Sequence, residues 1–433
     1  MGGNGAIEGR SILALYHYMR LQFNMLRRLC DDGRMTAETT GTMRRWSMLA
    51  VALTSTLFAN VFINGAAFLI PTLHTERGLD LAKAGLLSSM PSFGMVFTLI
   101  AWGYVVDRIG ERIVLALGSA LTAGAAFAAA SAHSLVGVGT FLLLGGMAAA
   151  SSNSASGRLV VGWFPPQQRG LVMGIRQTAQ PLGVGLGALV IPRLAENYGV
   201  SAALLFPAVV CAASAVVCAV AVKDPPRPPR TEATEDDLAN PYRGSATLWR
   251  IHAVSMLLVA PQVVVWTFTL VWLMTERGWS AGSAGVLVTV AQVLGAVGRI
   301  AAGRWSDVVR SRLRPIRVIA LAAAASMGLL ALTDWLASPI SVAMVVVASV
   351  ITVSDNGLAF TAIAEIAGPF WSGRALGTQN TSQLLTAGVA PPLLGALIGV
   401  AGYAAAFAVC AFFPLIAIPL VPVETDPLIS GRT

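Results

Sequence analysis

Long apolar runs, each about as long as a bilayer is thick, fill most of this sequence of 433 residues. A membrane-spanning helix needs roughly 20 mostly apolar residues, and charged or Gly- and Pro-containing breaks separate about twelve such runs. The runs do not alternate apolar with polar residues, and a backbone in lipid must satisfy its own hydrogen bonds, so we predict helices rather than barrel strands. The predicted spans are 47–70, 84–105, 113–132, 136–163, 170–192, 201–222, 248–273, 283–305, 316–336, 340–366, 374–399 and 403–422.

The largest break between the runs is the stretch KDPPRPPRTEATEDDLANPYRGS, Lys223 to Ser245. It is rich in Pro and charge and cannot bury a core, and it separates six spans from six. We therefore predict an all-α membrane protein with twelve transmembrane helices in two pseudo-symmetric six-helix bundles. The predicted domains are a tail at 1–45, a bundle at 46–222, a linker at 223–246, a second bundle at 247–422 and a tail at 423–433.

The basic residues predict the orientation. The tails, the linker and the loops on their side hold 22 of the 29 Lys and Arg, and the opposite loops hold four. Cytosolic loops of membrane proteins are enriched in Lys and Arg, so both termini and the linker are predicted to be cytosolic. The same bias accounts for the net charge of +8 without a nucleic-acid partner. Lys occurs only twice beside abundant Ala, Gly and Val, which favours a bacterial protein in the cell membrane.

The N-terminal segment can be interpreted in two ways. Residues 1–34 place apolar residues at helical spacing opposite several Arg, which fits either an amphipathic helix on the inner leaflet or an upstream extension before a natural start at Met35 or Met43.

The four Cys form no CxxC pair, and the chain lacks HExxH, GxSxG and phosphate-loop motifs. We therefore predict no enzymatic activity, no cofactor and no metal site.

A repeat runs through the two halves. Gly103, Asp107 and Arg112 have residues of the same type 200 positions later, at Gly303, Asp307 and Arg312. The tetrapeptide TERG of 75–78 also recurs, at 275–278. Farther along, the offset becomes 203, where Asn153 matches Asn356 and Gln180 matches Gln383. This pattern indicates a parallel duplication, which is one of the known plans of transporters.

The first copy of the repeated loop resembles the signature of the major facilitator superfamily, G-x-x-x-D-R-x-G-x-R. Its residues here are Gly103, Asp107, Arg108, Gly110 and Arg112, and the second copy keeps only Gly303, Asp307 and Arg312. The resemblance covers about residues 46–422. It implies alternating access, with Asp107 at the start of the span 374–399 near Gly373 and Arg374, and Asp307 at the start of the span 170–192 near Arg169, both latching the cytosolic side. The other reading of the loop Arg residues is a topology signal alone.

Ionisable and amide side chains inside the spans are candidates for transport, because polar groups in lipid are costly. Asp355 lies deep in the span 340–366 and either pairs with an Arg or carries a proton part of the time, and Arg176 is the candidate for attracting an anion. Arg158, Arg299 and Glu365 lie near enough to the surface to snorkel. The amide candidates, which could also simply bond between helices, are Asn60, Asn64, Asn153, Gln180, Asn356, Gln379 and Gln383.

These residues favour a secondary active transporter of a small organic solute, proton-coupled and working by alternating access. Its predicted partners are the solute, the proton and membrane lipid, and we expect a monomer. A drug/proton efflux pump is the alternative: Gly174, Gly183 and Gly187 keep the spacing of the antiporter motif, but Ala188 stands where that motif has Pro. A non-transporting receptor is the lesser alternative, since such a protein would be expected to lose its deep charges.

Overall fold

The computed structural model describes residues 37–69, 81–226 and 231–425. The amphipathic segment predicted at 1–34, the first TERG tetrapeptide and most of the C-terminal tail lie outside these residues. The chain divides into two compact units, 1–47 and 48–433. Of the first unit the structure describes residues 37–47, which are helical and form the start of α2 Ala37–Gly65; the contacts and sites described below lie in the second unit.

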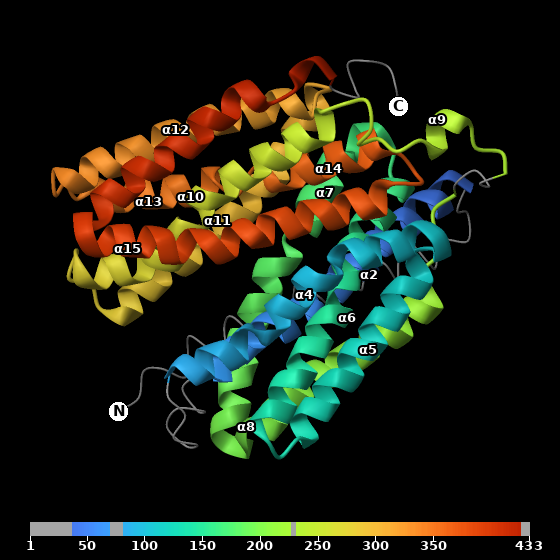
Figure 1. The fold of residues 1–433 in the computed structure, drawn as a ribbon, viewed down its shortest axis with the longest axis horizontal. Coiled ribbons are helices and arrows are strands. Elements are labelled where there is room, and N and C mark those ends of the chain that lie inside the picture. Colours follow the sequence, from blue (N-terminus) through green and yellow to red (C-terminus); the bar gives the residue numbers. More distant parts are fainter. Residues whose placement is uncertain (1–36, 70–80, 227–230, 426–433) are drawn as a thin grey trace. The chain divides into compact units, whose positions relative to one another are not determined.

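Helices make up the described chain, in which no β-strand occurs (Figure 1). The N-terminal half ends with Ala221, and the C-terminal half begins with Thr247. The helices of the first half are α2 Ala37–Gly65, α4 Leu81–Ile109, α5 Glu111–Ser131, α6 Leu135–Trp163, α7 Pro166–Arg176 and α8 Ala179–Ala221, with a 3-10 turn η1 Ala66–Leu69. The short helix α9 Glu235–Leu238 lies in the linker. The helices of the second half are α10 Thr247–Thr275, α11 Ala281–Val308, α12 Leu313–Trp335, α13 Ile340–Ile351, α14 Asn356–Ala367 and α15 Ser372–Leu420, with η2 Val423–Thr425.

Ten continuous helical stretches of the described residues are long and apolar enough to cross a membrane. Two of them are far longer than a bilayer needs: residues 166–221 and 372–420. Each contains one glycine in the left-handed region, Gly199 with φ 83° and Gly402 with φ 80°. Only glycine adopts this conformation at little cost, so each stretch is two spans joined by a one-residue turn. The twelve-helix fold predicted from the apolar runs is thereby confirmed.

Two spans are interrupted within the membrane. The first break separates α7 from α8 at Gln177 and Thr178, and the second separates α13 from α14 at residues 352–355. Pro181 explains the first break, because proline has no N–H to donate to the carbonyl of Gln177, four residues earlier. In the second break, Thr352 and Ser354 turn their hydroxyls back to the carbonyls of Ala348 and Val350. We had expected Asp355 inside a continuous helix; the structure instead has it in this break.

Glycines bring the two halves into contact at the end where the linker enters, which we call the linker end. There α4 packs along α15, and α7 along α11 (Figure 1). A Cβ on Gly103 would overlap the backbone of Gly373, and a Cβ on Gly303 would overlap the backbone of Gly170. The two contacts are equivalent under the repeat, since Gly303 and Gly373 follow Gly103 and Gly170 by 200 and 203 positions. Small residues allow helices in lipid to approach this closely.

Candidate functional site

A carboxylate at the end of α4 binds the start of α15. Asp107 is 3% exposed and accepts hydrogen bonds from the backbone N–H groups of Gly373, at 2.8 Å, and Arg374, at 3.1 Å. The Nε of Arg374 donates to the same carboxylate at 2.9 Å. The first N–H groups of a helix have no partner inside it and carry partial positive charge. The structure thus has Asp107 at the helix start that the family resemblance implied.

Further charges surround Asp107 within the N-terminal half. Arg158 of α6 donates to Asp107 at 2.8 Å and lies 3.0 Å from the Oε1 of Glu111, at the start of α5. Its Nη2 reaches across to the carbonyl of Pro369 in the other half at 2.6 Å. We call Asp107, Glu111, Arg158 and Arg374 the first ion cluster. Its two carboxylates and two guanidiniums balance, which is what burial of charge requires.

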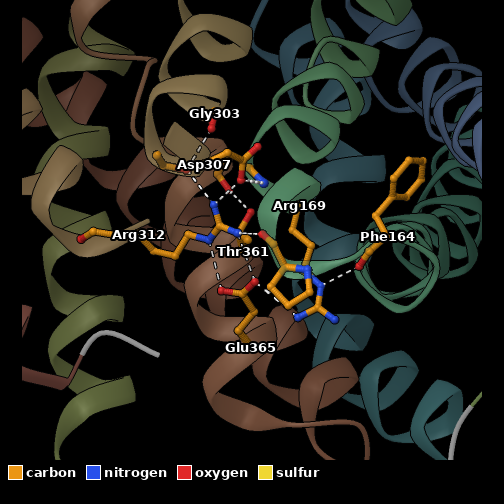
Figure 2. Close-up of polar contacts among 12 residues, drawn as sticks. Phe164, Arg169, Gly303, Asp307, Arg312, Thr361 and Glu365 are labelled. Carbon is orange, nitrogen blue, oxygen red and sulfur yellow. Dashed lines mark hydrogen bonds and ion pairs between the residues drawn. The ribbon is translucent and has the colours of Figure 1, made fainter. Parts of the chain in front are cut away.

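A carboxylate at the end of α11 likewise binds two backbone N–H groups of α7, at the fifth and sixth residues of that helix (Figure 2). Asp307 is 5% exposed and accepts from the N–H groups of Gly170 at 3.0 Å and Leu171 at 2.8 Å. Arg312, just before α12, donates to Asp307 at 2.6 Å and also to the carbonyl of Pro166. The family resemblance pointed to Arg169 at this helix start, but the side chain that binds Asp307 is Arg312.

Glu365 of α14 completes this arrangement. It accepts from the Nε of Arg312 at 3.1 Å and from Arg169 at 3.4 Å, and Figure 2 shows its carboxylate between the two guanidiniums. Burial alone would lower the pKa of Arg312, but Glu365 and Asp307 more than offset this and raise that pKa above its ordinary value. We call Asp307, Arg312, Glu365 and Arg169 the second ion cluster. It too holds two carboxylates and two guanidiniums.

The snorkelling considered for Arg158, Arg299 and Glu365 is wrong. The side chains of Arg158 and Glu365 are 5% and 1% exposed and belong to the two ion clusters, while Arg299 is 3% exposed. Snorkelling needs a charged head that reaches water, and these heads end in protein instead. The polar partners that hold them lie far away in the sequence, so the spans alone could not reveal them.

Three residues of the first loop motif do not join its ion cluster. Arg108 is exposed and lies 4.5 Å from the ring of Tyr104. Arg112 is also exposed and donates from its side chain to the carbonyl of Ala219. Gly110 has a φ of 94°, and a Cβ there would collide with the carboxylate of Asp224, which accepts from the N–H groups of Glu111 and Arg112. These residues shape the loop rather than the contact between halves.

Arg176 ends α7 at the first break and is 2% exposed. Its three nitrogens donate to the Oγ of Ser156 at 3.0 Å, the carbonyl of Asn153 at 3.0 Å and the Oε1 of Gln177 at 2.8 Å. All of these partners are neutral. Within the described residues no carboxylate pairs with Arg176, so it is a buried cation without a counter-ion.

Asp355 lies in the second break and is 1% exposed, and its Oδ2 has no hydrogen-bond partner. The guanidinium that acts electrostatically on Asp355 is that of Arg299. Arg299 donates to the carbonyl of Gln177 at 3.0 Å, while its own Nε is buried without a partner. Two opposite charges thus lie near each other, each with an unused polar atom.

The predicted amides divide into three groups. Asn356 and Gln383 form a chain with Gln262, which was not among the predicted amides: Asn356 donates to Gln262 at 3.1 Å and accepts from Gln383 at 3.2 Å. Asn60 and Asn64 donate to backbone carbonyls one turn earlier, at 2.8 Å and 3.1 Å. The others are separate: the side chain of Asn153 donates to the sulfur of Met95, and Gln180 is exposed. The amide chain next to Asp355 is the group that the structure brings together.

Sequence reasoning missed His252, which holds the remaining amide. Its Nδ1 lies 2.7 Å from the Oε1 of Gln379, and its Nε2 lies 3.0 Å from the hydroxyl of Tyr242 in the linker. Burial raises the pKa of Tyr242 to about 12, so this hydroxyl remains protonated. Gln379 is fully buried, and its Nε2 has no partner. A lone His in an apolar span gave no signal, because its partners come from the linker and from α15.

A duplicated bundle of membrane-spanning helices, with glycine contacts and buried ion clusters where its halves meet, defines a multi-pass membrane transport protein. Residues 50–391 match the Major Facilitator Superfamily, and the chain belongs to this family. It is 60% identical over 393 residues to an MFS-type transporter of Mycobacterium tuberculosis, with 91% of this chain and 88% of that protein covered.

More distant similarities agree with this family. The chain is 24% identical over 427 residues to the gallate transporter of Pseudomonas putida, with 85% of this chain and 91% of that protein covered. Its fold is similar to the solved structure of the proton:xylose symporter XylE, with a TM-score of 0.72 at 15% identity, covering 89% of this chain and 97% of the other. At that identity the likeness concerns the fold alone.

Proposed function

We propose that the protein is a secondary active transporter that carries a small organic anion together with a proton across the cell membrane by alternating access. The observation that carries this proposal is Arg176, a buried guanidinium whose described partners are all neutral. A buried charge without a counter-ion is costly. A transported anion would supply the missing charge when it binds. The name of the gallate transporter, a relative over most of the chain, agrees with an organic anion.

Asp355 is the proposed proton carrier. It is a carboxylic acid in a break of a spanning helix, with one oxygen unused. Buried carboxylates take up protons more readily than exposed ones, and a neutral Asp355 would cross the closed state at lower cost. Interrupted helices with buried polar groups at the level of the membrane are a feature of substrate and ion sites in transporters. Proton coupling is also what the name of the structurally similar symporter states for that protein.

The two ion clusters are the proposed latch of alternating access. Both join the halves at the linker end, through backbone N–H groups of a helix in the other half and through charges that are balanced only while the halves are together. The bias of basic residues supports a cytosolic location for this end. A protein with intact clusters would therefore be closed toward the cytosol, and separation of the clusters would open the site inward.

Transport into proteoliposomes tests the proposal. A panel of carboxylates and neutral sugars is offered with and without a pH gradient in which the outside is more acidic than the inside. We expect at least one carboxylate to accumulate above its external concentration only when the gradient is present. Asp355→Asn should abolish that accumulation but keep exchange of the solute between the two sides, and Arg176→Lys should weaken binding, because Lys lacks the planar donor fork. Accumulation by Asp355→Asn that matches the unmodified protein would exclude Asp355 as the coupling group.

A further inference from the structure

Gln177 holds one guanidinium from each half of the protein. Pro181 removes the N–H that would otherwise bind the carbonyl of Gln177 in a helix, and Arg299 of α11 donates to this carbonyl at 3.0 Å. The side-chain Oε1 of the same residue accepts from Arg176 of α7 at 2.8 Å. A short break in one span thus fixes two cations on either side of a single residue.

The charges around this point do not balance. Arg176, Arg299 and Asp355 are two guanidiniums and one acid, so the three together are positive when Asp355 is ionised and more positive when it is protonated. The other charged or titratable side chains on helices packed against α13 and α14 are Arg158, Arg169, Arg250, His252, Arg304, Asp307, Arg314, Arg317, Asp334, Arg374, Tyr403 and Cys410 on their neighbours and Glu365 on α14 itself. Of all these groups, Arg299 is the one that acts electrostatically on Asp355.

Arg299 and Asp355 each have a polar atom that makes no hydrogen bond. The Nε of Arg299 and the Oδ2 of Asp355 are both buried and both lack a hydrogen-bond partner, although the two groups attract each other. No ion pair joins them in the part of the chain that the structure describes. A buried donor or acceptor without a partner costs free energy, so each atom is ready to bind a further group. For Arg299 that group is an anion, and for Asp355 it is a proton.

We propose that Arg176 and Arg299 together bind the carboxylate of one solute anion, and that Asp355 competes with the solute for Arg299. The inference rests on the proposed function and adds Arg299 as the residue that links the binding of the solute to the binding of the proton. An ionised Asp355 attracts Arg299 and weakens the hold of Arg299 on the solute. A protonated Asp355 releases Arg299, whose planar donors suit a carboxylate. Solute and proton then favour each other's binding by the same factor.

Equilibrium binding to the purified full-length protein tests this scheme. The probes are acetate, succinate, benzoate and glucuronate, with glucose as the neutral control. For a probe that binds, we expect the affinity to fall by up to about tenfold per pH unit above the protonation range of Asp355, which is the slope of one linked proton. Asp355→Asn should bind with the acidic-pH affinity at every pH. Arg299→Gln should bind more weakly and without the slope.

Two further variants separate the role of Arg299 from damage to the fold. Arg299→Lys keeps the charge and should keep the pH slope at a lower affinity. Arg304→Gln removes an exposed charge five residues later on α11 and should behave as the unmodified protein. Each variant must elute as a monodisperse peak before its binding is compared. A pH slope in Arg299→Gln equal to that of Arg304→Gln would overturn the inference.

The outcomes also separate this inference from the proposed function. If the unmodified protein binds and accumulates no carboxylate, the proposed function and the inference both fall. If it accumulates a carboxylate with the pH gradient, but Arg299→Gln retains the full pH slope of binding, only the inference falls. Pro181→Ala offers an independent check. It returns an N–H to the carbonyl of Gln177, which should release Arg299 from this position and, as in Arg299→Gln, reduce both the carboxylate affinity and the pH slope of binding.

Discussion

The two ion clusters make the same kind of contact with different residues. In each, an Asp at the end of one helix binds two backbone N–H groups of a helix in the other half, at the start of α15 in the first cluster and at the fifth and sixth residues of α7 in the second. In each, an Arg reaches across to a proline carbonyl, and Pro369 follows Pro166 by the repeat offset of 203. The Arg itself differs: Arg158 comes from α6 in the first cluster, and Arg312 precedes α12 in the second.

The counterparts of these residues show how the charges were redistributed. Thr361 stands 203 positions after Arg158, and Gly162 stands 203 before Glu365, so neither charge has an equivalent in the other half. Arg112 and Arg312 occupy the same place in the loop motif, yet the first is exposed and the second is buried. What both clusters keep is neutrality, with two carboxylates and two guanidiniums in each. Charge balance is thus retained although position is not, as burial of charge demands.

The largest effect is expected from Arg312→Gln. This change leaves Asp307 and Glu365 buried with only Arg169 to balance them, and breaking a buried ion pair costs about 3–5 kcal/mol. The apparent melting temperature of the purified protein should fall markedly. Arg158→Gln should have a similar effect, because it strands Asp107 and Glu111 in the same way. A melting temperature unchanged from that of Arg304→Gln would mean that the second cluster is not a stabilising unit.

A smaller and equal effect is expected from Asp107→Asn and Asp307→Asn. Asp107→Asn removes a negative charge from the start of α15, where such a charge is worth up to about 2 kcal/mol, Asp307→Asn removes the charge that binds the N–H groups of Gly170 and Leu171, and each change leaves its cluster with one excess cation. In a Cys-free background, Ser372→Cys is buried beside the first cluster, and both changes should increase its labelling by a thiol reagent. Ser245→Cys, exposed in the linker, gives the labelling maximum. Clearly unequal labelling would show that the clusters are not equivalent.

The smallest effect is expected from Arg112→Gln. The side chain is exposed and bonds to one carbonyl, that of Ala219, and surface substitutions of this kind usually change stability by less than about 0.5 kcal/mol. The melting temperature of Arg112→Gln should therefore remain close to that of the unmodified protein, whereas that of Arg312→Gln, the same change in the second copy of the motif, should fall. Equal losses in the two variants would show that the motif position, rather than burial, determines the role of the Arg.

The sequence predicted the parts of this structure that depend on local pattern. The twelve spans followed from apolar length, and the repeat indicated that Asp107 and Asp307 should have matching environments. Pro181 could have predicted the break after Arg176, since a proline in a helix frees the carbonyl four residues earlier. The break before Asn356 had only a weak signal, in which Thr352, Ser354 and Asp355 compete with the backbone for hydrogen bonds.

The partners of the buried charges could not be predicted in this way. Arg158 meets Asp107 across 51 residues, and Arg169 meets Glu365 across 196. Nothing in a single span distinguishes a charge that reaches water from one that ends at a distant carboxylate. The same holds for Arg299 and for His252, whose roles depend on groups from the other half or from the linker. Such residues become visible only when the helices are packed together.

The central claim is that the two ion clusters hold the halves together at the linker end, and the distance between the halves there tests it most directly. Ile109 and Val309 are both exposed and lie at the ends of α4 and α11. Spin labels attached at these two positions in a Cys-free background report that distance by pulsed electron paramagnetic resonance. Asp107→Asn combined with Asp307→Asn should shift the distribution toward longer distances, whereas Arg304→Gln should leave it unchanged. An unshifted distribution in the double variant would contradict the account, because the halves would then stay closed without either carboxylate.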